Sequence, residues 1–254
     1  MKTKLKTKRY FDYKLSLFFL VVLFLAFSFN GKSNQPIKKE NKLELKKREK
    51  SHDVEVEKEF SGIKSIDIST ISGNCKVFRS DDSIVKVTLT HHYKPARTYE
   101  PIFEQKGDVL KLKEHMTGSN SGNSEWVLVV PAQTNINFKS ASGSMSIKDI
   151  TGKIKVRTAS GHVIVSLAES PKFDISISSA SGNTEIDFNN NPIAGTIEMK
   201  ARADIGKIEC PIEFTSQEEE SDGNQAYMVR SVVVENESPV FKIHTASGTA
   251  ILKK

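Results

Sequence analysis

The sequence has few cysteines and few aromatic residues. Its 254 residues include two cysteines, Cys75 and Cys210, and aromatic residues make up 8% of the chain. Two cysteines are too few for a small disulfide-stapled domain, whereas about two hundred residues can bury an ordinary hydrophobic core. The tryptophan, Trp126, opens a strand that also carries Leu128 and Val130, which favours a place in that core over a sugar-stacking platform.

Common sequence signatures of catalysis and cofactor binding are also missing. The chain has no strict match to a hydrolase nucleophile elbow, an HExxH zinc motif, a CxxC pair or a glycine-rich phosphate loop. Serine precedes glycine at several places, but a catalytic nucleophile occurs once, so the repetition indicates turn geometry. We therefore expect a protein that is not an enzyme, with no catalytic, cofactor-binding or metal-binding residues and no cofactor.

An acidic surplus is lacking too, since 37 basic residues stand against 31 acidic ones. The positive charge is concentrated at the N-terminus, where residues 1–33 hold seven basic and one acidic residue and residues 34–50 hold seven and three. Residues 51–254 keep 23 basic and 27 acidic residues. A nucleic-acid-binding domain is expected to be basic itself, so we predict no nucleic-acid partner.

The first thirty residues have the pattern of an export signal. Met1–Lys14 is basic, and Leu15–Phe29 is an apolar run interrupted by two serines. A membrane-spanning helix needs about twenty apolar residues and a secretory core about 7–15, so the length predicts a signal peptide at 1–33. Cleavage is expected after Ser28, with Gly31 and Ser33 as a second choice, and the alternative is an uncleaved membrane anchor. No cysteine lies just after the run, and the first in the chain is Cys75, which argues against a lipoprotein.

Residues 34–52 are predicted to be a charged linker. The stretch 34–50 is rich in lysine, and its apolar residues are too sparse to form a useful face. The alternative is a polybasic strip that associates with an anionic membrane or another envelope polyanion. Each basic residue near such a surface would contribute about 1 kcal/mol, and salt would weaken the attraction.

From residue 54 onward, apolar and polar residues alternate with the period of a β-strand. Such alternation places one set of side chains in a core and the other in solvent. We find no amphipathic helix of any length, so residues 53–254 are predicted to form one all-β domain. The expected core positions include Ile63, Ile66, Ile68, Phe173, Ile175, Ile177, Ile197, Met199, Ala201, Ala203 and Ile205.

One short unit recurs along this domain: an alternating strand, a turn of small residues that ends in glycine, and a second alternating strand. Glycine adopts positive φ without steric cost, serine and threonine can bond the turn, and alanine leaves room for the next coil. A unit of about twenty residues is typical of stacked repeats. The turns end at Gly73, Gly143, Gly152, Gly161, Gly182, Gly206 and Gly248.

This repeat predicts a β-solenoid, most specifically a right-handed single-stranded parallel β-helix. Its coils would stack inward Ile, Val, Leu and Phe in ladders at about 4.8 Å per rung. The alternative is a Greek-key β-sandwich, because short strands with glycine turns suit that fold as well. Residues 215–226, TSQEEESDGNQA, interrupt the repeat and predict an acidic loop.

Three sequence elements occur in a characteristic order: Ile63–Ile68 leading to Ser72-Gly73, then Gly107–Leu112, then Trp126–Pro131 followed by the serine–glycine turns. The order resembles the adhesin-like family of bacterial envelope proteins, a domain of unknown function related to the auto-transporter-adhesin-head-like (GIN) domain. The resemblance covers residues 55–254. It implies an exported β-helical domain in the periplasm, outer envelope or cell surface of a bacterium, and it brings no catalytic residues.

Four histidines are weak candidates for a metal site. His91 and His92 are adjacent on a strand, so their side chains should point to opposite faces and not chelate one ion. His162 follows a turn glycine and His244 precedes one, so separate rungs could bring these two together. We expect no metal at the histidines.

Acidic residues give a second weak candidate, for calcium. Calcium takes several oxygen ligands, but the chain has no DxDxDG spacing, and solvated acidic loops are common. We therefore expect these acids to be structural. The residues concerned are Glu218, Glu219, Glu220 and Asp222 beside Gly223 and Asn224, and the pair Asp81-Asp82 in another turn.

Both cysteines fall at inward positions, and solenoid rungs would hold them farther apart than the roughly 7 Å between Cα atoms that a disulfide allows. We expect two free, buried thiols. The expected recognition surface is the non-repetitive loop with Tyr93, Pro95, Arg97 and Tyr99, because function often lies where a regular scaffold is interrupted.

The function predicted from these features is an exported, non-enzymatic envelope or surface protein, a β-helical scaffold for adhesion, binding or assembly. Its partner would be an envelope or surface protein or glycan, and the chain a monomer or weak oligomer. Two alternatives stay open: a polysaccharide-active β-helix enzyme, and an envelope sensor or assembly subunit that associates end to end. The second rests on Leu252-Lys253-Lys254, where the chain stops directly after a strand with no evident cap.

Overall fold

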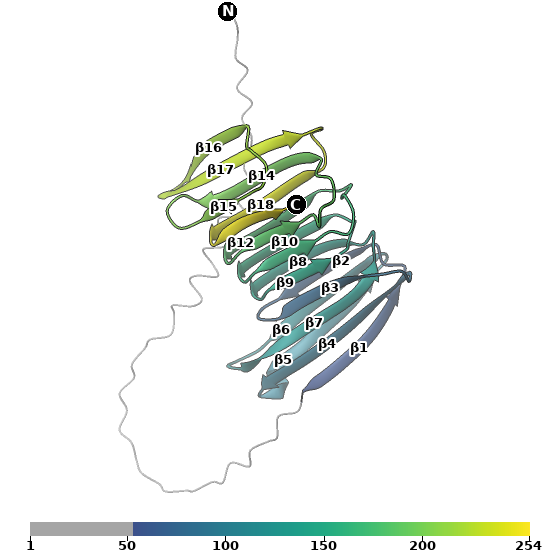
Figure 1. The fold of residues 1–254 in the computed structure, drawn as a ribbon. Helices are drawn as coiled ribbons and strands as arrows, with labels where there is room; N and C mark the ends of the chain where they lie inside the picture. The colour runs from purple at the N-terminus through teal and green to yellow at the C-terminus, as the bar shows by residue number, and fades with distance from the viewer. Residues whose placement is uncertain (1–52) are drawn as a thin grey trace, which may run out of the picture. The chain divides into compact units, whose positions relative to one another are not determined.

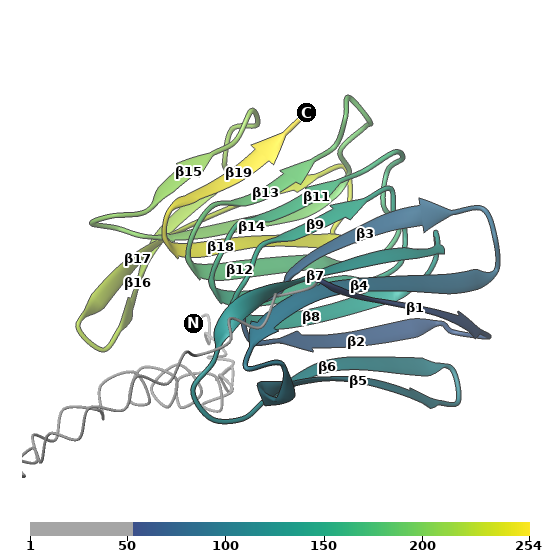
Figure 2. The ribbon, with the colours of Figure 1, turned by 90° about the horizontal axis from the view of Figure 1, so that it is seen from below.

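The computed structural model describes residues 53–254, which form an all-β domain. Nine strands make one sheet and ten make the other, and the two face each other across one hydrophobic core (Figures 1 and 2). The predicted signal peptide at 1–33 and the linker at 34–52 lie outside the described residues. Within residues 53–254, no helix is long and apolar enough to cross a membrane.

The middle of each sheet is a stack of parallel strands. Each coil contributes one strand to the ten-stranded sheet and the next strand to the nine-stranded sheet (Figure 2). Register is maintained from coil to coil, so that Ile136, Ile154 and Ile175 stand opposite one another. The coils are β8 (Asn135–Ser142) with β9 (Met145–Lys148), β10 (Ile154–Ser160) with β11 (Val163–Ser166), and β12 (Ile175–Ser181) with β13 (Thr184–Asp187).

At the N-terminal end, the first coil in the sequence is not the outermost, because a later coil lies on its outer side. β2 (Ser65–Thr70) is hydrogen-bonded between β6 (Val109–Met116) and β8, and β3 (Asn74–Ser80) between β7 (Ser121–Pro131) and β9. Antiparallel strands extend the sheets outward: β5 (Tyr99–Lys106) beside β6, and β4 (Ile84–Lys94) then β1 (Val54–Ser61) beside β7. The 3-10 turn η1 (Ala96–Thr98) joins β4 to β5.

The C-terminal end has the same topology. β18 (Val240–Ser247) lies between β12 and β14 (Gly195–Arg202), and β19 (Thr249–Lys253) lies between β13 and β15 (Lys207–Glu209). The last strand is therefore internal to its sheet. The prediction that the last rung is uncapped is wrong, because β15 covers the outer side of β19. The end of the stack is formed by a coil that comes earlier in the sequence.

The acidic residues 215–226 form a hairpin and not the predicted loop. β16 (Ser216–Asp222) pairs antiparallel with β17 (Gln225–Val234), which pairs in turn with β14. The two residues between the strands include Gly223 with φ of 61°, as short hairpin turns require. The hairpin forms the outer edge of the ten-stranded sheet.

Inward side chains form continuous rows, as the alternation predicts. Because each rung packs against both neighbours, a single coil could not bury its inner face alone. One row of fully or almost fully buried residues in the ten-stranded sheet runs through Leu112, Ile68, Phe138, Val156, Ile177, Ile243 and Met199.

Three of the predicted core residues are wrong. Phe173 precedes β12 and is 52% exposed, and Ile205 follows β14 and is 48% exposed. Ala203 is exposed as well. The alternating pattern continues in the sequence beyond the end of each strand, but outside the hydrogen-bonded ladder nothing holds these side chains over the core.

The all-β prediction is confirmed, and the pairing refines it. The central strands are parallel, whereas the neighbouring strands of a Greek key are antiparallel. β1, β4, β5, β16 and β17 pair antiparallel toward the edges of the sheets, whereas the edge strand β15 pairs parallel with β19, so both sheets are mixed and differ from a uniformly parallel stack.

Candidate functional site

The repeated turn glycines form a column at one edge of the domain. A Cβ built on Gly161 would lie 2.3 Å from the carbonyl oxygen of Gly143, and one on Gly182 would lie 2.3 Å from that of Gly161. These glycines are therefore needed for the close approach of coils as well as for their positive φ. In order through the stack, the column consists of Gly73, Gly143, Gly161, Gly182 and Gly248.

A hydroxyl three residues before a turn glycine links its coil to the coil before it. The threonines and serine involved are almost fully buried. The sequence predicted bonds from such residues to the turn backbone, and Thr158 Oγ1 makes one to Ser160 O at 3.0 Å. The structure adds bonds between coils. Thr158 Oγ1 donates to Gly143 O at 3.3 Å, Ser179 Oγ to Gly161 O at 2.9 Å, and Thr245 Oγ1 to Gly182 O at 2.8 Å.

A shallow groove with a volume of about 550 Å³ lies beside this column. Ser160, Ser181 and Ser247 line it at equivalent register positions on β10, β12 and β18, so the same hydroxyl recurs from coil to coil. We call this feature the turn groove. The other lining residues are Gly161, His162, Gly182, Asn183, Ile205, Lys207, Gly248 and Thr249.

The imidazole of His162 in the turn groove is already engaged. Its Nδ1 accepts a hydrogen bond from the backbone N–H of Asn183 at 3.1 Å, and Asn183 Oδ1 accepts one from the N–H of Thr249 at 3.0 Å. A ring nitrogen held in this way does not act as base for a serine. The groove thus offers donors and acceptors to a polar ligand, without a nucleophile–base pair at His162.

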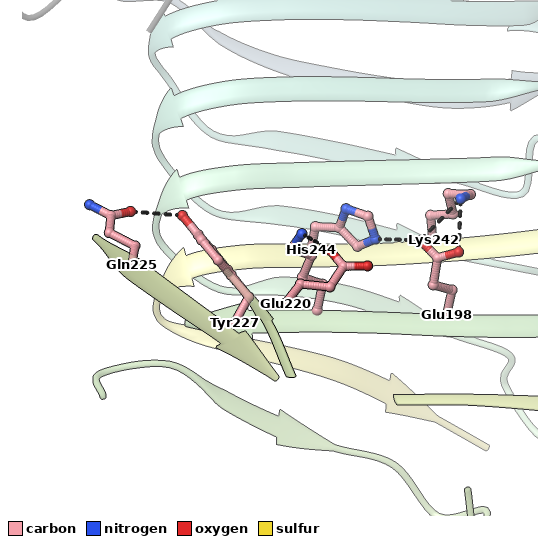
Figure 3. A network of polar contacts seen from close by, with 7 residues as sticks. Glu198, Glu220, Gln225, Tyr227, Lys242 and His244 are labelled. Carbon is pink, nitrogen blue, oxygen red and sulfur yellow. Dashed lines mark hydrogen bonds and ion pairs between the residues drawn. The ribbon is translucent and has the colours of Figure 1, made fainter. Parts of the chain in front are cut away.

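A second cluster of charged side chains lies on the outer face of the ten-stranded sheet (Figure 3). Glu198 on β14 contacts Lys242 Nζ at 2.8 Å and His244 Nε2 at 3.1 Å, both on the neighbouring β18. The bond with His244 and the Lys242 ammonium lower the pKa of Glu198 to about 2. Glu198 is therefore a fixed negative charge at neutral pH and not a proton acceptor.

Lys200 anchors the acidic hairpin to the same face. Its Nζ lies 2.6 Å from Glu220 Oε2 and 4.8 Å from the ring centroid of Tyr227. The Tyr227 hydroxyl donates to Gln225 Oε1 at 2.9 Å (Figure 3). On β16, Glu218, Glu220 and Asp222 share one face of the strand and Glu219 lies on the other. In the described part of the chain, no three His, Cys, Asp or Glu side chains are grouped to hold a metal.

The histidines considered as metal ligands have separate environments. The His91 ring packs on Tyr99 with centroids 4.5 Å apart, and His92 Nδ1 lies 3.0 Å from Asp53 Oδ1. Burial lowers the pKa of His91. His162 lies in the turn groove and His244 on the outer face of β18, each with the partner described above.

The expected recognition loop does not present its tyrosines. Tyr93 and Tyr99 are each 6% exposed, and their rings stack with centroids 4.3 Å apart. That prediction is wrong for the two tyrosines, because they close the N-terminal end of the core, although Pro95 and Arg97 are exposed. The core position expected for Trp126 is confirmed, since it is fully buried.

Sequence reasoning missed a buried carboxylate at this end. Glu114 on β6 is 8% exposed, and among residues 53–254 it forms no ion pair. The sequence pattern could have indicated this burial, because Leu110, Leu112 and Glu114 share one side of an alternating strand. Its two oxygens accept hydrogen bonds from Ile71 N at 2.7 Å, Ser72 N at 3.3 Å, Trp126 Nε1 at 3.0 Å, Tyr99 OH at 3.3 Å and Ser124 Oγ.

Glu114 takes the place of a turn carbonyl from a neighbouring coil. In the next coil, the N–H of Ser142 donates to the carbonyl of Ile71 at 2.8 Å. Ser72 occupies the equivalent position one rung earlier, where the Glu114 carboxylate supplies the acceptor. With five donors around it, this carboxylate is a structural cap and has no free lone pair facing a ligand.

The two cysteines are free and lie at different places in the stack. Cys75 is buried as predicted, but Cys210 is only half-buried, because it lies beyond the short edge strand β15. Five strand spacings, about 24 Å, separate β3 from β15, which excludes a disulfide between them. Burial raises the pKa of both thiols.

The model of the Toastrack family, DUF4097, matches residues 27–252. The chain belongs to this family. The resemblance to an adhesin-like domain of unknown function is thereby confirmed. No curated protein matches the sequence.

Solved structures include similar proteins at low sequence identity. A proposed cell adhesion protein from Clostridium sporogenes is 13% identical, with 80% of this chain and 99% of that chain covered and a TM-score of 0.54. A proposed adhesin from Bacteroides fragilis is 13% identical, with coverage of 79% and 96% and a TM-score of 0.33. A proposed lipid binding protein from Parabacteroides distasonis is 12% identical, with coverage of 80% and 96% and a TM-score of 0.27. The first of these shares the fold of this Toastrack chain.

Proposed function

We propose that the protein is an exported, non-enzymatic component of the bacterial cell envelope or surface and serves as a binding scaffold in adhesion or assembly. The observation that carries this proposal is the turn groove, where successive coils present serine hydroxyls in register beside His162, Asn183 and Lys207. Groups held on a hydrogen-bonded ladder lose little freedom when they bind, which favours recognition of a polar protein or glycan.

Other observations support the same function. The adhesion role proposed for the Clostridium protein of similar fold is consistent with it. The enzyme alternative has less support, because His162 is bonded to a backbone N–H and Glu198 is held ionised by Lys242 and His244. Export rests on the apolar run at Leu15–Phe29.

We also propose that the coils wind as a right-handed single-stranded β-helix, a β-solenoid with antiparallel strands at both ends. Parallel pairing from β8 to β18 supports this winding. About 98% of crossovers between parallel strands of one sheet are right-handed. An experimentally determined structure with left-handed coils would refute the assignment.

Localisation and adhesion can be measured on cells that produce the full chain. We expect the protein in the envelope fraction, accessible to protease on spheroplasts or intact cells, and we expect beads coated with it to adhere to mucin or to cell-wall sacculi. Exclusive recovery from the cytoplasm would refute export. Release of sugars from either material would favour the enzyme alternative instead.

The turn groove is tested with a matched pair of double variants. His162→Ala with Lys207→Ala removes two groups of the groove, whereas His115→Ala with Lys172→Ala removes the same residue types at exposed positions outside it. We expect the first pair to reduce adhesion and the second to leave it unchanged. Equal adhesion by the two would rule out the groove as the binding site.

A further inference from the structure

Five basic side chains gather on the outer face of the ten-stranded sheet. They lie on β6, β8 and β10, three of the four parallel strands that stand in the order β10-β8-β2-β6. They alternate with buried residues on β6, β8 and β10, so they point away from the core. We call them the basic strip. They are Lys111 and Lys113 on β6, Lys139 on β8, and Lys155 and Arg157 on β10.

The sheet register arranges the strip in two rows that cross the strands. In one row, Lys113 is followed by Ser69 on β2, and then by Lys139 and Arg157, which stand directly opposite each other. In the other row, Lys111 and Lys155 are separated by Asp67 and Asn137. Adjacent strands are about 4.8 Å apart, so the strip forms a flat grid of positive charge.

No neighbouring acid in the described part of the chain forms an ion pair with these cations. Within residues 53–254, no carboxylate oxygen lies within 4.0 Å of a basic nitrogen of the strip. Asp67 is inside the strip, and its Oδ1 accepts a hydrogen bond from Asn137 at 2.9 Å. Glu104 stands opposite Lys111 at the edge of the sheet but pairs with Lys106 at 2.9 Å. Repulsion, mainly from Arg157, lowers the pKa of Lys155.

The overall charge of the domain conceals this surface. Residues 51–254 hold 23 basic and 27 acidic residues, yet the strip combines five basic residues with one acid, Asp67. Like charges on directly opposed strand positions are destabilising, so an anion that lies across Lys139 and Arg157 gains by relieving their repulsion. Clustered cations also raise the local concentration of an anionic ligand.

We propose that the basic strip binds a linear anionic polysaccharide across the strands. Its acidic groups would pair with the five cations, and its hydroxyls would bond to the polar groups between them, Ser69 and Asn137. This deepens the proposed function, on which it rests, by assigning a ligand class to a second surface of the scaffold.

The chemistry of the strip favours a polysaccharide over other polyanions. No aromatic side chain among its rows could stack on nucleic-acid bases, the usual device for binding single strands. Of the residues paired with the strip, one large apolar side chain is exposed, Ile102 opposite Lys113, which is less apolar surface than membrane-surface segments provide. Hydroxyl and amide groups among cations suit a hydroxylated chain that carries regular negative charges.

The test measures binding of the full chain to immobilised polygalacturonate, with neutral dextran as the blank. Lys139→Glu with Arg157→Glu reverses the opposed pair, and Lys148→Glu with Lys172→Glu makes the same charge change at exposed sites off the strip. Residues 34–50 are unchanged in all proteins, so their own attraction cancels. We expect the strip variant to bind about tenfold more weakly at low salt and the control within about twofold of wild type.

Folding is monitored by melting temperature, and Lys139→Gln with Arg157→Gln replaces the reversal variant if that one fails to fold. Equal binding by strip and control variants would overturn the proposal. So would a strip-dependent affinity for anionic vesicles or DNA that exceeds the affinity for polygalacturonate. Normal polysaccharide binding by a chain that stays in the cytoplasm would refute the proposed envelope function and leave the strip intact. Loss of adhesion in the groove variants with no strip effect would refute the strip alone.

Discussion

The two ends of the stack share a topology but are completed by different chemistry. At the N-terminal end, the turn between β2 and β3 meets the buried carboxylate of Glu114, which is enclosed by Trp126 and Tyr99. At the C-terminal end, β14 is extended by a hairpin whose contacts include Lys200 with Glu220 on the exposed face. Both ends are extended by antiparallel strands, but only the N-terminal end also has a turn whose acceptors come from one buried side chain. Such a turn concentrates stability in one residue, and the extending strands spread it over many weak contacts.

The largest expected effect is at the N-terminal end. Glu114→Ala would leave three buried and two part-buried donors without their acceptor and should lower the free energy of unfolding by about 3–5 kcal/mol. Urea unfolding measures the loss. The control, Glu125→Ala, removes an acid that is 44% exposed and should cost less than about 1 kcal/mol. Similar losses for the two variants would contradict the capping role of Glu114.

The regular middle should respond to any added side chain in the glycine column. Gly182→Ala would place a Cβ 2.3 Å from the Gly161 carbonyl, and we expect a loss of about 2–3 kcal/mol. Gly107 has φ of 60° but open space around it, so Gly107→Ala should cost only its conformational strain, about 1 kcal/mol. Equal melting temperatures for these variants would show that backbone conformation and not coil contact requires Gly182.

A pH-dependent contribution is expected from Glu198 near the C-terminal end. Its pKa is lowered from 4.5 to about 2, so the stabilisation is present above the unfolded value near 4.5 and is lost as the pH falls toward 2. The side chain is 30% exposed, so solvent screening limits the effect to about 1 kcal/mol. Wild type should melt higher than Glu198→Gln at neutral pH, and the difference should shrink on acidification. A difference that grows below pH 4 would reverse the assigned sign.

The smallest effect belongs to the acidic hairpin. Glu220 is 49% exposed, so Glu220→Gln should cost about 0.5 kcal/mol or less, and added salt should remove the difference. Glu219→Gln on the same strand is the matched control. Loss of more than about 2 kcal/mol in the first variant would mean that the C-terminal end, like the other, depends on one residue.

Much of the fold is predictable from local patterns. Period-two alternation is sufficient for the all-β class and for core positions such as Ile175 and Met199, and the serine–glycine turns reveal the repeat. The order of the strands within each sheet is harder to predict, because β2 and β18 each pair on both sides with strands that are distant in the sequence. The candidate site is only partly predictable from the sequence. The pattern reveals the turn residues, but it does not reveal that four coils align them into one groove.

By itself, the sequence determined the fold class, the recurring turn and the family, because alternation and glycine requirements act over a few residues. Tertiary structure alone decided that the last strand is internal, that Glu114 completes the first turn, and that five basic residues from three strands share one face. These features depend on register between strands up to seventy residues apart, where pairing and burial are set by the neighbouring coil and not by the adjacent sequence.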